Sequence, residues 1–258
     1  MGKPHIRVTR RHFCLTAGCV LASAAFSDAC LVESRTSPGS DGRLTARPPG
    51  GVVTSLVSGA LGLGSNGRDG AVQIPPAATR GPVPLLVFLH GATQNGEGML
   101  RRIGPAADQA GVAVLAPDSR GTTWDAIRDG FGDDVRFLDR ALEHVFSRLA
   151  IDPTRMALGG FSDGASYAIS LGLANGDLFP RITAFSPGFV ISAEPHGHPR
   201  FFVSHGTSDQ ILPIDRCSRV IVPRLRSIGY DVTFREFEGR HEVPPDVARE
   251  GLQWIAAG

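Results

Sequence analysis

Residues 156–174 read MALGGFSDGASYAISLGLA, and this stretch decides the fold. The apolar run Met156–Gly159 is typical of a buried strand, and residues Ala165–Ala174 are typical of a helix that Asn175-Gly176 closes. Between them, Gly160-Phe161-Ser162-Asp163-Gly164 has the spacing of a sharp strand-to-helix turn, whose glycines let the two elements approach closely. The stretch therefore predicts a serine at the carboxyl end of a buried strand. The N-terminal dipole of the next helix favours negative charge at that place.

Strands and helices alternate along the rest of the chain. Apolar runs predict strands at 84–89, 112–116, 182–185, 201–204 and 232–237, and helical spacing predicts helices around 99–110, 133–149, 214–228 and 245–256. Such alternation predicts an α/β fold, with a mostly parallel sheet covered by helices on both faces. Since 258 residues suffice for one large domain, we expect a single catalytic domain over residues 49–258.

The composition excludes some classes of function. The hydrophobic content of 42% and charged content of 20% are those of an ordinary globular protein. A net charge of +1 gives no basic footprint for a nucleic-acid partner. No group of His, Cys, Asp or Glu has metal-ligand spacing, so we expect no metal and no cofactor.

A serine hydroxyl becomes a nucleophile only beside a base that a carboxylate holds in one tautomer. Ser162 is the candidate nucleophile. Asp209 follows the predicted strand 201–204, and His241 follows the predicted strand 232–237. Because the carboxyl ends of parallel strands meet at one edge of a sheet, we expect these three side chains to meet there.

Other residues fit these roles less well. Asp215 and Glu194 are rival acids, but neither follows a strand end. The remaining histidines lie in the leader, on a helix, in a Pro/Gly-rich loop or in His-Gly turns: His5, His12, His144, His196, His198, His90 and His205.

An acyl-transfer intermediate needs two backbone N–H donors for its oxyanion. One expected donor is the N–H of Asp163, directly after the nucleophile. The other is expected in the loop 90–95, with Ala92 as first choice and Thr93 as second. A carboxylate that points at an oxyanion would oppose it, so the Asp163 side chain has to turn away or pair, with Arg120 as one candidate partner.

Three features of the sequence are candidates for the substrate pocket. The segment 189–200 is a candidate for one wall, and Trp124 and Phe131 are further candidate lining residues. Burial of Trp124 in the core is the alternative.

The N-terminus predicts export. Residues 1–30 combine Arg10-Arg11 with an apolar stretch too short to span a bilayer, as in a twin-arginine signal, and an ordinary secretory signal is the alternative. A second open interpretation is lipidation of Cys30, which would anchor the protein to a membrane. Residues 31–48 have no apolar periodicity and predict a flexible tether.

Four motifs carry a resemblance to a known family. They are Leu89-His90-Gly91, Gly160-Phe161-Ser162-Asp163-Gly164, His205-Gly206-x-x-Asp209-x-x-x-Pro213 and Gly239-x-His241-Glu242. With these motifs in this order, the chain resembles the phospholipase/carboxylesterase family of α/β-hydrolases. It is also similar to the related secreted feruloyl esterases and polyhydroxybutyrate-depolymerase-like esterases.

The resemblance implies an α/β-hydrolase fold without a metal. It also implies cleavage of carboxylic esters with small or medium acyl groups, in small-molecule or polymeric substrates. Two departures affect the oxyanion hole: Asp163 stands where members often carry a neutral residue such as Gln, and Ala-Thr-Gln-Asn follows His90-Gly91. An amidase or serine peptidase of the same fold and a non-catalytic binding protein are the alternatives.

Overall fold

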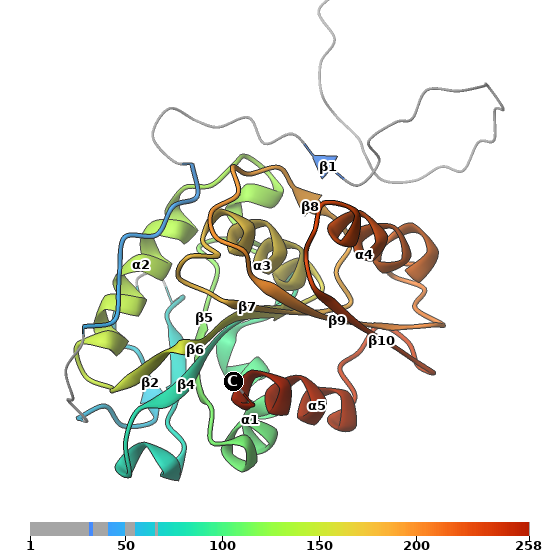
Figure 1. The fold of residues 1–258 in the computed structure, drawn as a ribbon. Helices are drawn as coiled ribbons and strands as arrows, with labels where there is room; N and C mark the ends of the chain where they lie inside the picture. The colour runs from blue at the N-terminus through green and yellow to red at the C-terminus, as the bar shows by residue number, and fades with distance from the viewer. Residues whose placement is uncertain (1–30, 33–40, 50–54, 65–66, 258) are drawn as a thin grey trace, which may run out of the picture.

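The computed structural model describes residues 31–32, 41–49, 55–64 and 67–257. Its main sheet has eight strands in the order β10-β9-β7-β6-β4-β5-β3-β2 (Figure 1). They are β2 (Gly59–Ala60), β3 (Gly70–Gln73), β4 (Val83–Leu89), β5 (Ala113–Pro117), β6 (Ile151–Phe161), β7 (Arg181–Phe185), β9 (Arg200–Gly206) and β10 (Val232–Phe237). Every pairing among β4, β5, β6, β7, β9 and β10 is parallel. The predicted mostly parallel sheet is therefore confirmed.

Two strands that extend the sheet beyond β5 were not predicted. β3 pairs antiparallel with β5, and β2 pairs antiparallel with β3. Both are too short for a periodicity to show in the sequence. A separate pair joins β1 (Leu31–Val32) to β8 (Val190–Ile191) in parallel.

Helices cover both faces of the sheet. They are α1 (Gly96–Ala110), α2 (Asp133–Phe146), α3 (Asp163–Ala174), α4 (Ser218–Ser227) and α5 (Pro245–Ala256), with short 3₁₀ turns η1 (Pro76–Thr79), η2 (Asp125–Ile127) and η3 (Ile214–Arg216). Helices α1 and α5 pack on one face, whereas α2, α3 and α4 lie on the other (Figure 1).

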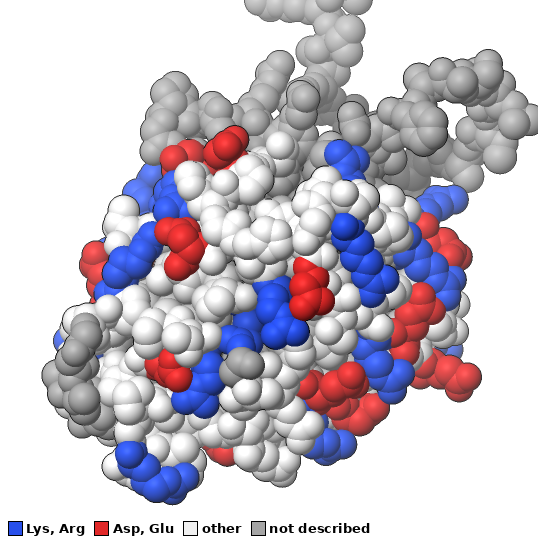
Figure 2. Space-filling model, viewed as in Figure 1, with Lys and Arg blue, Asp and Glu red and all other residues white. Residues whose placement is uncertain are grey.

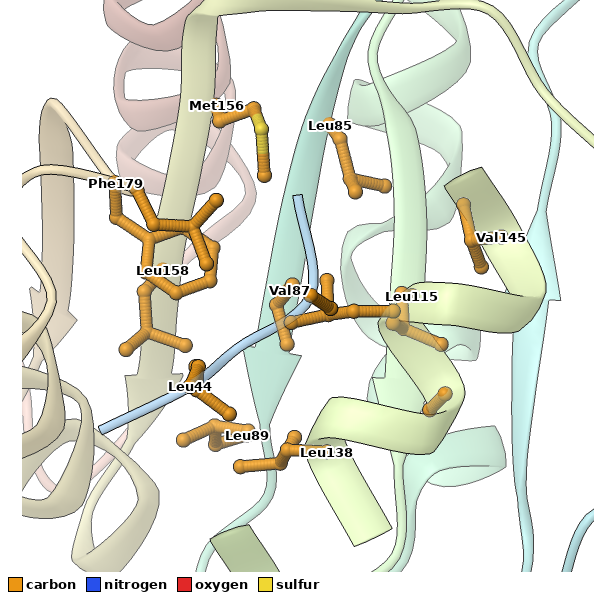
Figure 3. Packing of buried hydrophobic residues seen from close by; sticks show 14 of the residues in the cluster. Leu44, Leu85, Val87, Leu89, Leu115, Leu138, Val145, Met156, Leu158 and Phe179 are labelled. Carbon is orange, nitrogen blue, oxygen red and sulfur yellow. The ribbon is translucent and has the colours of Figure 1, made fainter. Parts of the chain in front are cut away.

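The continuous apolar sequence of β4 follows from its place in the middle of the sheet, where all seven of its residues are buried. Leu85, Val87 and Leu89 point into the cluster under α2, which Figure 3 shows from close by. Leu86 and Phe88 point to the opposite face, under α1 and α5. Alternate side chains of one strand therefore fill two cores, as a doubly covered parallel sheet requires.

Residues 41–48 differ from the prediction of a flexible tether. Leu44 is 2% exposed and Ala46 is 4% exposed, and Figure 3 shows Leu44 near Leu89. The Arg43 guanidinium also forms an ion pair with Asp177 at 2.7 Å. The sequence suggested a tether because two apolar residues in a polar stretch show no period, yet each fills a place in the core.

The predicted export signal, Cys30 and residues 33–40 of the predicted tether lie outside the described residues. Within the described part of the chain, no helix is long and apolar enough to cross a membrane. On the face of the molecule drawn in Figure 2, acidic and basic side chains are interspersed. Among the described residues, several acidic and basic side chains pair, as Arg200 does with Asp231 at 2.8 Å.

Candidate active site

Ser162 lies on a strained turn between β6 and α3. Its φ of 58° and ψ of −120° are sparsely populated by residues with a side chain, and such a conformation costs on the order of 1–3 kcal/mol. A Cβ at Gly164 would lie 2.2 Å from the Leu89 carbonyl oxygen, and one at Gly160 would lie 2.4 Å from Gly164. Only glycine fits at both positions, which explains the Gly-x-Ser-x-Gly pattern. The turn presents the Ser162 hydroxyl at the carboxyl end of β6.

The structure brings together the three residues that the sequence predicted. The distance from His241 Nε2 to Ser162 Oγ is 2.9 Å, and the distance from His241 Nδ1 to Asp209 Oδ2 is 2.6 Å. Nδ1–H donates to the ionised carboxylate, which leaves Nε2 free to accept the serine proton. The rival acid Asp215 instead pairs with Arg219 at 2.7 Å.

Three donors hold the Asp209 carboxylate. Oδ1 accepts from the backbone N–H groups of Ile211 (2.9 Å) and Leu212 (2.8 Å), while Oδ2 faces His241. Burial alone would raise the pKa of Asp209. The hydrogen bonds, of which the one from Leu212 contributes most, lower it by more than burial raises it, so the pKa lies below its ordinary value. The carboxylate therefore stays ionised and keeps both oxygens as acceptors.

A second, fully buried histidine supports the acid loop. His205 Nε2 donates to the Leu212 carbonyl oxygen at 2.7 Å and lies 3.2 Å from Asp209 Oδ2. Its Nδ1 accepts from the Ser218 hydroxyl at 2.7 Å. Burial lowers the pKa of His205, so the ring stays neutral with its proton on Nε2. The sequence placed His205 in a His-Gly turn but did not predict its contact with Asp209.

The His241 ring packs against Phe161, the residue before the nucleophile. The two ring centroids lie 4.8 Å apart. Phe161 is itself 3% exposed, and the Arg102 guanidinium carbon lies 5.4 Å from its centroid. The motif Gly-x-Ser-x-Gly leaves this second position open, so no sequence signal singles out Phe161.

The loop after β4 lies against the nucleophile, because a Cβ at Gly91 would be 3.3 Å from Ser162 Cβ. Thr93 has a φ of 62°, and its backbone N–H donates to the Thr122 carbonyl oxygen at 2.7 Å. The Ala92 N–H has no acceptor among the described residues. The Asp163 N–H is the first of α3 and has no partner within the helix. The geometry therefore favours Ala92 over Thr93 as the partner of Asp163 in an oxyanion hole.

The buried His90 side chain holds the loop after β4 in place through two hydrogen bonds. Its Nδ1 donates to the Gly91 carbonyl oxygen at 2.7 Å, and its Nε2 accepts from the Ser119 N–H at 2.9 Å. Burial lowers the pKa of His90, which matches a neutral ring with these two roles.

The Asp163 side chain pairs with Thr123, not with Arg120. Thr123 Oγ1 donates to Asp163 Oδ2 at 2.6 Å. The Arg120 guanidinium donates instead to the backbone carbonyls of Arg68 and Asp118, each at 2.8 Å. The candidate pairing with Arg120 was therefore wrong.

Trp124 and Phe131 do not line a pocket. Trp124 is 0% exposed and Phe131 is 3% exposed, and both pack against Tyr167, with centroid distances of 5.2 and 5.6 Å. Trp124 Nε1 donates to the His90 carbonyl oxygen at 2.9 Å, so its one polar atom is satisfied inside the protein. The prediction that they contact substrate is corrected: Trp124 supports the loop after β4 from within the core.

No group of three or more His, Cys, Asp or Glu residues within the described ranges could hold a metal ion. The chemistry that this arrangement offers is that of a base-activated serine hydroxyl beside two backbone N–H groups.

Comparisons with known proteins agree with this architecture. A family model described as phospholipase/carboxylesterase matches residues 120–256. The chain is 27% identical over 159 residues to the probable feruloyl esterase C of Aspergillus niger, covering 58% of each chain. It is 28% identical over 142 residues to the S-formylglutathione hydrolase of Bos taurus, covering 45% of this chain and 50% of that one. It thus spans less than three fifths of the length of these relatives.

Among solved structures, esterase PE8 superposes with a TM-score of 0.59 at 21% identity, covering 73% of this chain and 97% of that one. At this identity the likeness shows the fold alone.

Proposed function

Because the chain has the α/β-hydrolase fold and belongs to the phospholipase/carboxylesterase family, we propose that it hydrolyses carboxylic esters through an acyl-enzyme intermediate. The observation that carries the proposal is the unbroken hydrogen-bonded chain from Asp209 through His241 to Ser162.

In the first half of the reaction, Ser162 Oγ attacks the ester carbonyl carbon while His241 Nε2 takes the hydroxyl proton. Asp209 keeps His241 in the required tautomer and stabilises the imidazolium. The carbonyl oxygen becomes an oxyanion that accepts hydrogen bonds from the N–H groups of Ala92 and Asp163, each worth about 3 kcal/mol in comparable sites. His241 then gives its proton to the leaving alcohol, and Ser162 keeps the acyl group.

In the second half, a water molecule takes the place of the alcohol. His241 accepts a proton from the water, whose oxygen attacks the acyl carbon and forms a second oxyanion in the same hole. The carbon–oxygen bond to Ser162 breaks, the proton returns to Ser162 Oγ, and a carboxylic acid leaves.

The proposed substrates are esters with small or medium acyl groups, in small molecules or in polymers. A matched relative is named a feruloyl esterase, which makes aromatic esters one class to test. An amidase or peptidase would use the same Ser162 and His241 on a poorer leaving group.

Substitution of Ser162 by alanine tests the function. We expect Ser162→Ala to fold as the wild type does, to lose labelling by a fluorophosphonate probe, and to lose ester turnover by on the order of 10⁶-fold. The measurement uses p-nitrophenyl esters of increasing chain length beside methyl ferulate and a polyester emulsion. Each assay is run with and without EDTA, and we expect EDTA to leave the turnover unchanged. Retention of more than about a thousandth of wild-type turnover would exclude Ser162 as nucleophile.

We also propose that residues 1–30 direct export, either by the twin-arginine route or by the general secretory route. Cys30 is a candidate for lipidation. A reporter fused behind these residues should be exported, and the double substitution Arg10→Lys with Arg11→Lys should block export by the twin-arginine route. Unchanged export of the double variant would assign the signal to the general route.

A further inference from the structure

Asp163 combines two opposing roles in the proposed mechanism. Its backbone N–H donates to the oxyanion, while its own side chain carries a negative charge a few bonds away. Like charges at such separations repel, and the repulsion is stronger near a protein surface or interior than in bulk water. The carboxylate is compatible with catalysis only if something holds it in a harmless position.

Helix α3 itself stabilises the Asp163 carboxylate. Asp163 is the first residue of α3, where the N-terminal dipole stabilises a carboxylate. This effect does not choose a direction for the side chain, however, because the oxyanion would use the same positive end of the helix. A directional contact is needed in addition.

Thr123 supplies the one side-chain hydrogen bond that Asp163 accepts among the described residues. The distance from Thr123 Oγ1 to Asp163 Oδ2 is 2.6 Å, the usual length of a hydrogen bond from a hydroxyl to a carboxylate. Thr123 is half-buried and lies 40 residues away in the sequence, in the loop between β5 and η2.

The backbone around Thr123 is fixed to the other half of the oxyanion hole. The carbonyl oxygen of Thr122 accepts from the Thr93 N–H at 2.7 Å, and Trp124 Nε1 donates to the His90 carbonyl oxygen at 2.9 Å. The three consecutive residues 122–124 therefore contact the loop after β4 on one side and the start of α3 on the other. The Thr123 hydroxyl is held at a defined place relative to both proposed donors.

We propose that Thr123 is a positioning residue, which holds the Asp163 carboxylate in the one orientation that leaves the oxyanion hole free. This inference rests on the proposed ester hydrolysis and deepens it. Without the Thr123 hydroxyl, the carboxylate turns toward the hole and opposes the charge that develops in the transition state. The ground state with its neutral carbonyl is affected less, so kcat should fall more than KM rises.

A double-mutant cycle tests the proposal. Thr123→Val should lower kcat for p-nitrophenyl acetate by about 10- to 100-fold, with KM within about twofold of wild type. In an Asp163→Asn background, which has no charge to hold, Thr123→Val should lower kcat less than about threefold. Thr123→Ser should keep wild-type kcat. Thr122→Val is the matched control, because this neighbouring threonine is exposed and its side chain makes no hydrogen bond among the described residues; it should behave as wild type.

Two outcomes would overturn the inference: wild-type kcat in Thr123→Val, or an equal loss with Asp163 intact and in the Asp163→Asn background, which would mean that the hydroxyl only shapes the loop. If Thr123→Val unfolds, the single variant Asp163→Asn decides. A tenfold loss of kcat in that variant would contradict the proposal, because removal of a charge that has to be restrained should not slow the reaction. The rate of fluorophosphonate labelling of Ser162 gives a second readout, because the phosphonyl oxygen enters the same hole. Wild-type protein that is labelled but hydrolyses no ester would refute the proposed substrate class and leave this comparison of labelling rates intact.

Discussion

At the scale of single residues, the orientation of Asp209 decides what a change there would do. Its Oδ1 accepts from two backbone N–H groups, those of Ile211 and Leu212, so an amide in its place has to keep its oxygen at that position. In Asp209→Asn the amide nitrogen would therefore face His241 Nδ1–H, donor against donor. His241 would move its proton to Nε2 and lose the lone pair that accepts the Ser162 proton.

We expect Asp209→Asn to lower kcat by about 10⁴-fold while the protein stays folded, measured by steady-state hydrolysis of a p-nitrophenyl ester beside a thermal melt. Asp215→Asn and Glu194→Gln are the controls. Asp215 pairs with Arg219 and Glu194 is exposed, so both variants should keep wild-type turnover. A loss in Glu194→Gln as large as that in Asp209→Asn would reassign the acid.

At the scale of elements, two carboxylates join the start of α2 to η2. The Asp134 N–H donates to Asp125 Oδ2 at 2.8 Å, and the Asp125 N–H donates to Asp134 Oδ2 at 2.7 Å. Burial, followed by the negative charge of Asp125, raises the pKa of Asp134 from 3.8 to about 6. These contacts hold the chain directly after Thr123 and Trp124.

The raised pKa predicts a pH-dependent stability. Because the folded protein binds the Asp134 proton more tightly than the unfolded chain does, this group's stabilising contribution is complete below about pH 4 and is lost as the pH rises through about 6. The loss amounts to about 3 kcal/mol, at 1.36 kcal/mol for each pKa unit.

The measurement is the free energy of unfolding of the wild type minus that of Asp134→Asn, from urea titrations at pH 4 to 7.5. We expect this difference to fall by about 2–3 kcal/mol over that range. The same difference for Asp133→Asn, whose side chain is 74% exposed at the same helix end, should stay constant. A constant difference for Asp134→Asn as well would show that Asp134 does not titrate in this range.

At the scale of the whole molecule, residues 41–48 pack across α2 and α3. Two backbone N–H groups of this segment, those of Thr45 and Ala46, donate to Asp139 on α2 at 2.8 Å. Arg43 pairs with Asp177, just after α3. The folded domain therefore includes residues before position 49, where the sequence predicted its start.

Leu44→Ala tests whether this segment belongs to the fold. Since Leu44 is 2% exposed in the core cluster, the substitution should lower the free energy of unfolding by about 2–4 kcal/mol in chemical denaturation. Val57→Ala is the control, because Val57 is 78% exposed and its loss should change stability by less than about 0.5 kcal/mol. If both substitutions had equally small effects on stability, residues 41–48 would be a flexible tether, as the sequence predicted.

The sequence by itself determined the α/β architecture, the strand-to-helix turn at Ser162 and the candidate order of serine, acid and histidine. These features are local: hydrophobic period, glycine at positions without room for a Cβ, and polar residues just after strand ends. The strands β2 and β3 were missed because elements of two to four residues show no period.

Only the tertiary structure decided which side chains meet across long distances in the chain. It placed Thr123 on Asp163 and Leu44 in the core cluster under α2, and it buried Trp124 where the sequence allowed a pocket. A threonine, a leucine or a tryptophan has the same local pattern whether it faces solvent, substrate or core. What distinguishes these surroundings is the packing of segments 40 to more than 100 residues apart, and that packing exists only once the sheet and its helices have assembled.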